Sequence, residues 1–166
     1  DPDRVMDVLT GALAGTPQAG AILTWDTEYK TLGIYNDIDR NVGPIFADFP
    51  NSPDILNLLD YMSTAPGLVF GDLMYVEGNT YVSLGRTLRR DGVRQGYIGT
   101  GVTLQELSRL VTEISDLFGI TAFILHGRER VLAHPFLVGG HPEQSVQNPT
   151  VGLTRIGDPV VAAIWS

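Results

Sequence analysis

The sequence has no cysteine among its 166 residues, which excludes a disulfide framework and a thiolate metal site. It also has no apolar run of the roughly 18 residues that a membrane span needs, and no signal peptide is visible. The chain begins at Asp1 rather than at Met and ends just after the apolar stretch from Val160 to Trp165. We therefore interpret it as an excised piece of a longer protein, with any membrane anchor or output domain outside it.

Basic residues are scarce. Eleven Lys and Arg stand against nineteen Asp and Glu, so the net charge is -8, which disfavours nucleic acid as a partner because a polyanion requires clustered basic groups. Twelve of the acidic residues lie before Asn79, against only Arg4, Lys30 and Arg40. This asymmetry fits either a solvated acidic surface or the attraction of a cationic ligand. Hydrophobic residues make up 43% of the chain, enough for a folded core.

No motif for catalysis is present. His126, His134 and His141 lie close together in the sequence, but no two of them have the spacing of one helical turn that a zinc-binding helix shows. The glycines from Gly96 to Gly101 run in the reverse order of a dinucleotide fingerprint. No G-x-S-x-G elbow occurs either. We predict no catalytic residue, no metal and no cofactor, and we conclude that the fragment is not an enzyme.

The first part of the chain predicts a helix, two short strands and a long connection. Apolar residues recur at helical spacing from Asp3 to Leu13, and the runs Ala21 to Trp25 and Tyr29 to Tyr35 read as strands around a turn. Asp, Asn, Gly and Pro are frequent from Asn36 to Gly67, with a helical stretch around Asp54 to Met62. A connection of this length inside a compact domain is usually functional or disordered.

The middle of the chain predicts an antiparallel meander. Three strand-like runs cover Leu68 to Val76, Thr80 to Leu88 and Gln95 to Val102. They are joined by Glu77-Gly78-Asn79 and by Arg90-Asp91-Gly92, which suit hairpin turns because Gly and Asn tolerate a positive φ.

A helix with clear end signals follows the meander. Thr103 and Glu106 form a capping box, and Gly119 is placed to end the helix. We predict that this helix packs through an apolar face made of Leu107, Val111, Ile114 and Phe118. The runs Ile120 to Leu125 and Arg130 to Ala133 then predict a second hairpin.

These elements carry a resemblance. The stretch Gly96 to Leu107 (GYIGTGVTLQEL) resembles the last strand and following helix of the ligand-binding module in Cache domains. The segments Ile120 to Leu125 and Arg130 to Pro135 are similar to the next part of such receptors. The tail Ile156 to Ile164 is similar to sensor regions of bacterial adenylate and guanylate cyclases.

The resemblance implies an α+β fold, a PAS-like Cache sandwich with a central antiparallel sheet of five or six strands flanked by helices. Residues 1–119 would form a membrane-distal Cache module, and residues 120–166 would begin a second, incomplete module or a C-terminal extension. The implied function is extracytoplasmic ligand sensing, on the periplasmic side of the bacterial inner membrane, for a transmembrane signalling protein such as a nucleotide cyclase. The alternatives are a dimerisation module of a histidine kinase or chemoreceptor that binds no small ligand, and an unrecognised hydrolase or metal-binding enzyme.

The predicted ligand site lies on one face of the meander. Strand alternation puts Tyr97, Gly99 and Gly101 on the same face. The two glycines would leave the floor of the ligand pocket unfilled by side chains, and the segment between Asn36 and Gly67 would form the pocket walls. From the resemblance and the alternation, the full set of predicted ligand contacts comprises Asp72, Met74, Tyr81, Ser83, Tyr97, Gly99, Gly101 and Tyr61.

Two departures from the pattern of amino-acid-binding Cache domains narrow the class of ligand. Gly101 stands where many amino-acid-binding members carry Asp, and their R-x-W-Y cluster is absent between Asn36 and Gly71, which disfavours an α-amino acid. The expected partners are a small molecule of unknown identity and a second copy of the chain in a homodimer, whose interface would include the helix that contains Asp3 to Leu13. Attachment to the membrane would run through segments outside this fragment.

Overall fold

A computed structural model describes residues 2–16, 19–35, 53–76 and 78–165. Internal contacts divide the chain into two compact units, and each is described by itself. The first unit comprises Asp1–Asp72 with Val82–Val102, and the second comprises Leu73–Tyr81 with Thr103–Ser166. The sequence-based division into a module at 1–119 and a second segment at 120–166 stays a prediction.

A six-stranded sheet includes the strands of the first unit. Its order is β2-β1-β6-β5-β3, and β4 pairs separately with the beginning of β5, a hairpin that lies in the second unit. The elements are α1 (Pro2–Ala14), β1 (Ala21–Trp25), β2 (Thr31–Tyr35), α2 (Pro53–Thr64), β3 (Val69–Phe70), β4 (Met74–Val76), β5 (Asn79–Arg90) and β6 (Val93–Thr103). The expectation of five or six antiparallel strands between helices is confirmed.

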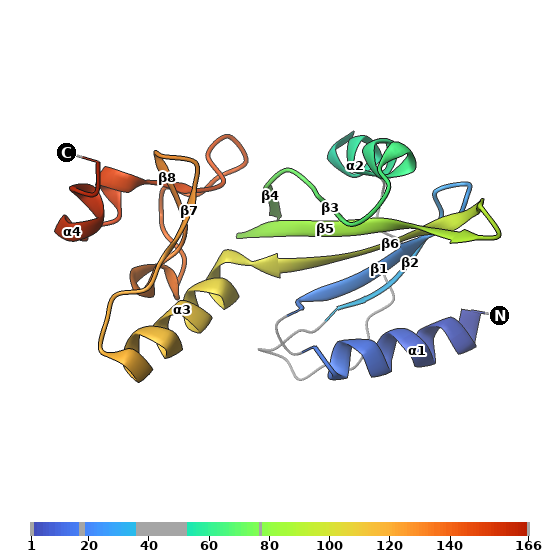
Figure 1. The fold of residues 1–166 in the computed structure, drawn as a ribbon, viewed down its shortest axis with the longest axis horizontal. Helices are drawn as coiled ribbons and strands as arrows, with labels where there is room; N and C mark the ends of the chain where they lie inside the picture. Colours follow the sequence, from blue (N-terminus) through green and yellow to red (C-terminus); the bar gives the residue numbers. More distant parts are fainter. Residues whose placement is uncertain (1, 17–18, 36–52, 77, 166) are drawn as a thin grey trace. The chain divides into compact units, whose positions relative to one another are not determined.

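The two helices of the first unit cover opposite faces of its sheet (Figure 1). One core cluster joins α1 to the first face of the sheet, through Met6, Leu9, Leu13, Ala19, Ile22 and Ile34. The other joins α2 to the second face, through Trp25, Leu58, Leu59, Met62, Val69 and Tyr97. The apolar stripe of α1 therefore packs on its own sheet, and the large apolar side chains that this helix exposes are Val5 and Val8.

In the first unit, glycines let β6 approach β1 and let β5 approach α2. At Gly96, φ is 150°, and an added Cβ would collide with the backbone carbonyl of Trp25. An added Cβ at Gly85 would collide with the Met62 side chain of α2. Glycine in a strand interior weakens the strand but permits another group to come close, and here that group is a neighbouring strand or α2.

The second unit is built around a small three-stranded sheet. Its order is β7-β8-β9, with antiparallel pairing throughout. The elements are α3 (Leu104–Phe118), β7 (Ile124–His126), β8 (Arg130–Ala133), η1 (Pro135–Leu137), β9 (Val151–Gly152), η2 (Leu153–Arg155) and α4 (Pro159–Ala162). Its core comprises Val131, Leu137, Val151, Leu153, Ile156 and Val161.

Two predicted helix signals are confirmed in α3. The Thr103 hydroxyl accepts the backbone N–H of Glu106 at 3.1 Å, and the Glu106 carboxylate accepts the backbone N–H of Thr103 at 2.9 Å. Gly119 ends the helix in the left-handed conformation, with φ 65°, which glycine adopts without steric cost. The hairpin turn at Asp91-Gly92 also has positive φ at both residues, as the sequence predicts.

The predicted packing face of α3 is wrong in part. Val111 is buried, but Ile114 and Phe118 are exposed. The side chains that α3 buries are those of Leu104, Ser108, Val111 and Ser115. The two serines are small enough to let the backbone that follows α3 approach the helix, and both bond to that backbone. Ser108 Oγ accepts the His134 N–H at 3.3 Å, and Ser115 Oγ accepts the Ala122 N–H at 2.9 Å.

Two further boundaries differ from expectation. The run Leu68 to Val76 forms two short strands rather than one, because β3 and β4 pair with different parts of β5. The strand expected from Ile120 begins only at Ile124. None of the helices within the described ranges has the length and apolar character required to cross a bilayer.

Replacing Val111 with Asp tests the observed face of α3. The Val111 side chain is 3% exposed, so the variant loses apolar burial and buries an unpaired charge, and we expect the free energy of unfolding to fall by about 3 kcal/mol or more. The matched control is Leu117→Asp, at a position that is 76% exposed, where we expect a loss below about 1 kcal/mol. Urea denaturation of both variants measures the difference, and equal losses would contradict the assigned face.

Candidate functional site

The candidate site is the sheet face of the first unit that α2 covers. The register pairs Ala21 with Gly101, Leu23 with Gly99 and Trp25 with Tyr97. Paired residues share a face of a sheet, so the sequence-based placement of Tyr97, Gly99 and Gly101 on one face agrees with the observed register. The presence of Trp25 and Tyr97 in the α2 core cluster identifies this face as the one under α2.

Ser83 on β5 belongs to the same face. An added Cβ at Gly71 would lie 3.4 Å from the Ser83 Cβ and 3.1 Å from a Leu58 methyl group of α2. Two residues along β5, Gly85 faces Met62, and the Thr87 hydroxyl donates to the Met62 carbonyl at 2.6 Å. Alternate residues of β5 therefore point toward α2, and Ser83 lies among them.

The floor at Gly99 is not open. An added Cβ at Gly99 would lie 3.1 Å from Cζ3 of the Trp25 indole, so the indole ring covers this glycine. The expectation of an unfilled floor is corrected at this position, because the tryptophan of the neighbouring strand occupies the space that glycine leaves.

Tyr97 is a core residue held by its neighbours. Its side chain is fully buried, and its ring stacks on Tyr29 with centroids 6.0 Å apart. Its hydroxyl accepts an N–H of Arg94 at 2.7 Å. Burial and the hydrogen bond with Tyr29 raise the pKa of the Tyr97 hydroxyl. The phenol therefore stays protonated and is held in place at the edge of the α2 core.

Two polar atoms on this face are buried without a hydrogen-bond partner. They are Nε1 of Trp25 and Oγ of Ser83, in side chains that are each 4% exposed. An unpartnered buried donor or acceptor costs about 1–3 kcal/mol, and such groups are rare in folded proteins. Indole N–H is a donor only, whereas a serine hydroxyl both donates and accepts. Each of the two atoms can therefore bond to a hydrogen-bond acceptor placed beside it.

The other predicted contacts lie in different surroundings. Tyr61 is on α2 but its side chain is 59% exposed, and Asp72 is exposed between β3 and β4. Met74 and Tyr81 pair with each other across β4 and β5, within the second unit. The segment predicted to form the walls falls largely at 36–52, outside the described residues.

Sequence reasoning did not assign Trp25 to the site. Its position could be found from the alternation of Ala21, Leu23 and Trp25 along β1, which matches that of Gly101, Gly99 and Tyr97 along β6. The lack of a hydrogen-bond partner for the indole N–H could not be found from the sequence, because it depends on how α2 packs over the ring.

Two of the three histidines have structural partners in the second unit. His134 is buried, its Nδ1 accepts the Phe136 N–H at 3.1 Å, and its Nε2 lies 3.2 Å from an Asp158 carboxylate oxygen. The N–H groups of Val161 and Val160, together with His134, hold the pKa of Asp158 below its ordinary value. His141 Nδ1 accepts the Glu143 N–H at 3.2 Å. Across the residues whose placement is described, His, Asp and Glu form no cluster suited to a metal ion.

Comparison with known proteins places the fold. No family model and no curated protein sequence matches the chain. Solved structures do: the sensory domain of the Campylobacter jejuni chemoreceptor Tlp3 (CcmL) has a TM-score of 0.61 at 14% identity over 86% of this chain and 56% of its own. The ligand-binding domain of the Pseudomonas fluorescens chemoreceptor CtaA, in complex with L-valine, has a TM-score of 0.58 at 16% identity over 94% of this chain and 63% of its own.

A third structure extends over almost the whole chain. The extracellular domain of mmHK1S-Z3, a candidate histidine kinase, has a TM-score of 0.63 at 14% identity over 99% of this chain and 64% of its own. This chain thus spans less than two thirds of each of these structures. At such identities the likeness concerns the fold alone: the chain has an α+β fold similar to that of these sensory and ligand-binding domains.

Proposed function

We propose that the chain senses a small molecule on the α2-covered face of its first unit, as the extracytoplasmic part of a bacterial transmembrane signalling protein. The fold supports this, because the similar structures are sensory and ligand-binding domains of chemoreceptors and the extracellular domain of a candidate histidine kinase. It has no catalytic role in the proposal. Its location on the periplasmic side of the inner membrane follows from the same likeness.

The observation that carries the proposal is the pair of unpartnered buried atoms, Trp25 Nε1 and Ser83 Oγ. Each carries a desolvation cost that the empty protein does not recover. A ligand that accepts a hydrogen bond from the indole N–H, and exchanges one with the serine hydroxyl, would recover both costs on binding. Ligand sites commonly have this composition, with apolar walls and a few placed polar groups that set orientation.

The proposed ligand is a small molecule with an apolar body and a hydrogen-bond acceptor. Leu58, Leu59 and Met62 of α2 supply apolar surface beside the sheet. Gly101 lies on the same face as Trp25 and carries no carboxylate that could hold an ammonium group, so the absence of the Asp found in many amino-acid-binding members keeps an α-amino acid disfavoured. The ligands of the similar chemoreceptors, such as 4-methylisoleucine and L-valine, belong to those proteins.

The output that the sensor controls remains part of the proposal. Nucleotide cyclase is the assignment that the tail from Ile156 to Ile164 supports through its resemblance. The three solved structures described above come from two chemoreceptors and a candidate histidine kinase, so these outputs are the alternative. Sequencing the gene on both sides of this chain would decide between them, and a cyclase domain downstream of a membrane span is the result we expect.

A second copy of the chain is the proposed protein partner, because cyclase and kinase outputs work as dimers and a signal can pass as a relative shift of two subunits. On α1, Val5 and Val8 are exposed beside the buried stripe and are the candidates for this contact. Sedimentation equilibrium over a range of concentrations should show self-association that Val8→Glu weakens. A strictly monomeric mass at high concentration would count against the dimer.

Removing the hydroxyl of Ser83 tests the ligand site. In the absence of ligand, we expect Ser83→Ala to raise the free energy of unfolding by about 1 kcal/mol, because an unsatisfied buried group is removed. We expect the same variant to bind the ligand about tenfold more weakly, as the loss of one hydrogen bond implies. The ligand is first identified by thermal-shift screening of the unmodified chain against small metabolites, and its affinity is then measured by calorimetry.

The matched control is Ser115→Ala, another buried serine, whose Oγ accepts the Ala122 N–H and donates to the Val111 carbonyl at 2.6 Å. This variant should be less stable by about 1 kcal/mol and should keep its affinity. A Ser83→Ala variant that loses stability while binding the ligand normally would contradict the proposal.

A further inference from the structure

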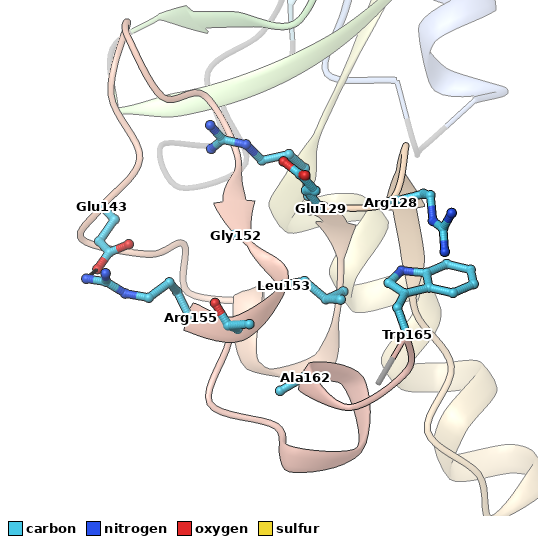
Figure 2. Close-up of a pocket in the computed structure, with 10 residues that line it drawn as sticks. Arg128, Glu129, Glu143, Gly152, Leu153, Arg155, Ala162 and Trp165 are labelled. Carbon is cyan, nitrogen blue, oxygen red and sulfur yellow. Dashed lines mark hydrogen bonds and ion pairs between the residues drawn. The ribbon is translucent and has the colours of Figure 1, made fainter.

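The second unit contains a groove that the proposed sensing site does not use. Its volume is about 580 Å³, within the range of small-molecule sites, roughly 300–1,000 Å³. All its walls come from the second unit, and they include Arg128, Glu129, Arg130, Leu153, Ala162 and Trp165. Figure 2 shows Arg128 beside Trp165 on one side, the Glu143–Arg155 pair on the other, and Leu153 and Ala162 between them.

The groove is locally basic in an acidic chain. Three arginines and two glutamates line it, a formal charge of +1, whereas the whole chain carries -8. Arg155 is neutralised by its ion pair with Glu143. Among the described residues, no carboxylate forms an ion pair with Arg128 or Arg130, so neither guanidinium charge has a counter-ion there.

The two uncompensated arginines are nevertheless held in position. The guanidinium of Arg128 lies over the Trp165 ring, 4.7 Å from its centroid. A guanidinium above an aromatic ring can still present N–H donors to a ligand. Arg130 donates from Nη1 to the Thr150 carbonyl at 3.0 Å and from Nη2 to the Asn148 amide oxygen at 3.4 Å. These acceptors are neutral, so they orient the guanidinium without cancelling its charge.

The rest of the lining is apolar or small. Leu153 is buried, Ala162 is half-buried, and Gly152 has no side chain. The Trp165 ring is 52% exposed and offers flat apolar surface next to the charge of Arg128. Guanidinium groups bind planar oxyanions through paired N–H donors.

From this arrangement we infer that the groove is a second binding site, for a small organic anion that joins a carboxylate or phosphate to a flat apolar body. The oxyanion pairs with the N–H edge of Arg128 and with the field of Arg130, and the apolar body lies on Trp165, Leu153 and Ala162. Glu129, which also lines the groove, repels such a ligand and limits its affinity. The inference rests on the second unit alone and stands whether or not the first unit binds a ligand.

The test is calorimetric titration of the whole chain with three probes of one shape: benzoate, phenyl phosphate and the neutral benzyl alcohol. We expect saturable binding of at least one anion, weakened by added salt, and none of the alcohol. The anion that binds more tightly shows whether the site prefers a carboxylate or a phosphate.

Three variants locate the binding. Arg128→Gln, at an exposed turn position, should weaken binding of the anion about tenfold, as loss of a charge-assisted hydrogen bond implies. Glu129→Gln should strengthen it a few-fold, because a like charge is removed. Arg109→Gln, an exposed arginine on α3 outside the groove, should leave it unchanged.

The inference is overturned by any of three results. They are no saturable binding of either anion at high millimolar concentration, equal binding of benzyl alcohol, or anion binding that Arg128→Gln and Arg109→Gln weaken alike. None of these variants touches the first unit, so a failure of this test leaves the proposed sensing site standing.

Discussion

The close contact between α2 and the glycine-bearing face of the sheet is the constraint on which the first unit depends. Gly85 leaves room for the Met62 side chain, and Gly99 leaves room for the indole of Trp25. A Cβ at Gly85 would displace the side chain of Met62, which is now fully buried, and a Cβ at Gly99 would press on the indole. The same closeness removes water from Trp25 Nε1 and Ser83 Oγ. Tight packing and unpartnered polar atoms thus have one physical cause.

That combination is a reason to regard the face as functional. Apolar side chains at both positions would remove the desolvation costs, and a packed scaffold gains nothing from keeping them. Several other buried hydroxyls among the described residues are bonded: Thr80 donates to the Pro149 carbonyl, and Ser108 and Ser115 each bond twice. The Ser83 hydroxyl differs from these, since it has no hydrogen-bond partner; Oε1 of Gln105, in the second unit, is also unpartnered.

Much of the architecture could be predicted from local sequence signals, because those signals act over a few residues. The capping box at Thr103 and the turn at Asp91-Gly92 are of this kind. The packing face of α3 could not, since its apolar residues surround much of the helix and only the tertiary bonds of Ser108 and Ser115 decide which side is covered. The face that bears Ser83 and Tyr97 followed from strand alternation, whereas the role of Trp25 depends on the position of α2, which no residue pattern specifies. The groove of the second unit brings the hairpin turn at Arg128 next to Trp165, a contact that sequence spacing does not reveal.

The most direct test of the central claim observes the indole N–H of Trp25. The chain has only two tryptophans, so a proton–nitrogen correlation spectrum contains two indole signals, and Trp165→Phe assigns them. On titration with the ligand found by thermal-shift screening, the account predicts that the Trp25 signal moves downfield and saturates together with the binding isotherm, because its N–H gains an acceptor. A Trp25 indole signal that stays unchanged while the ligand binds to saturation would contradict the account.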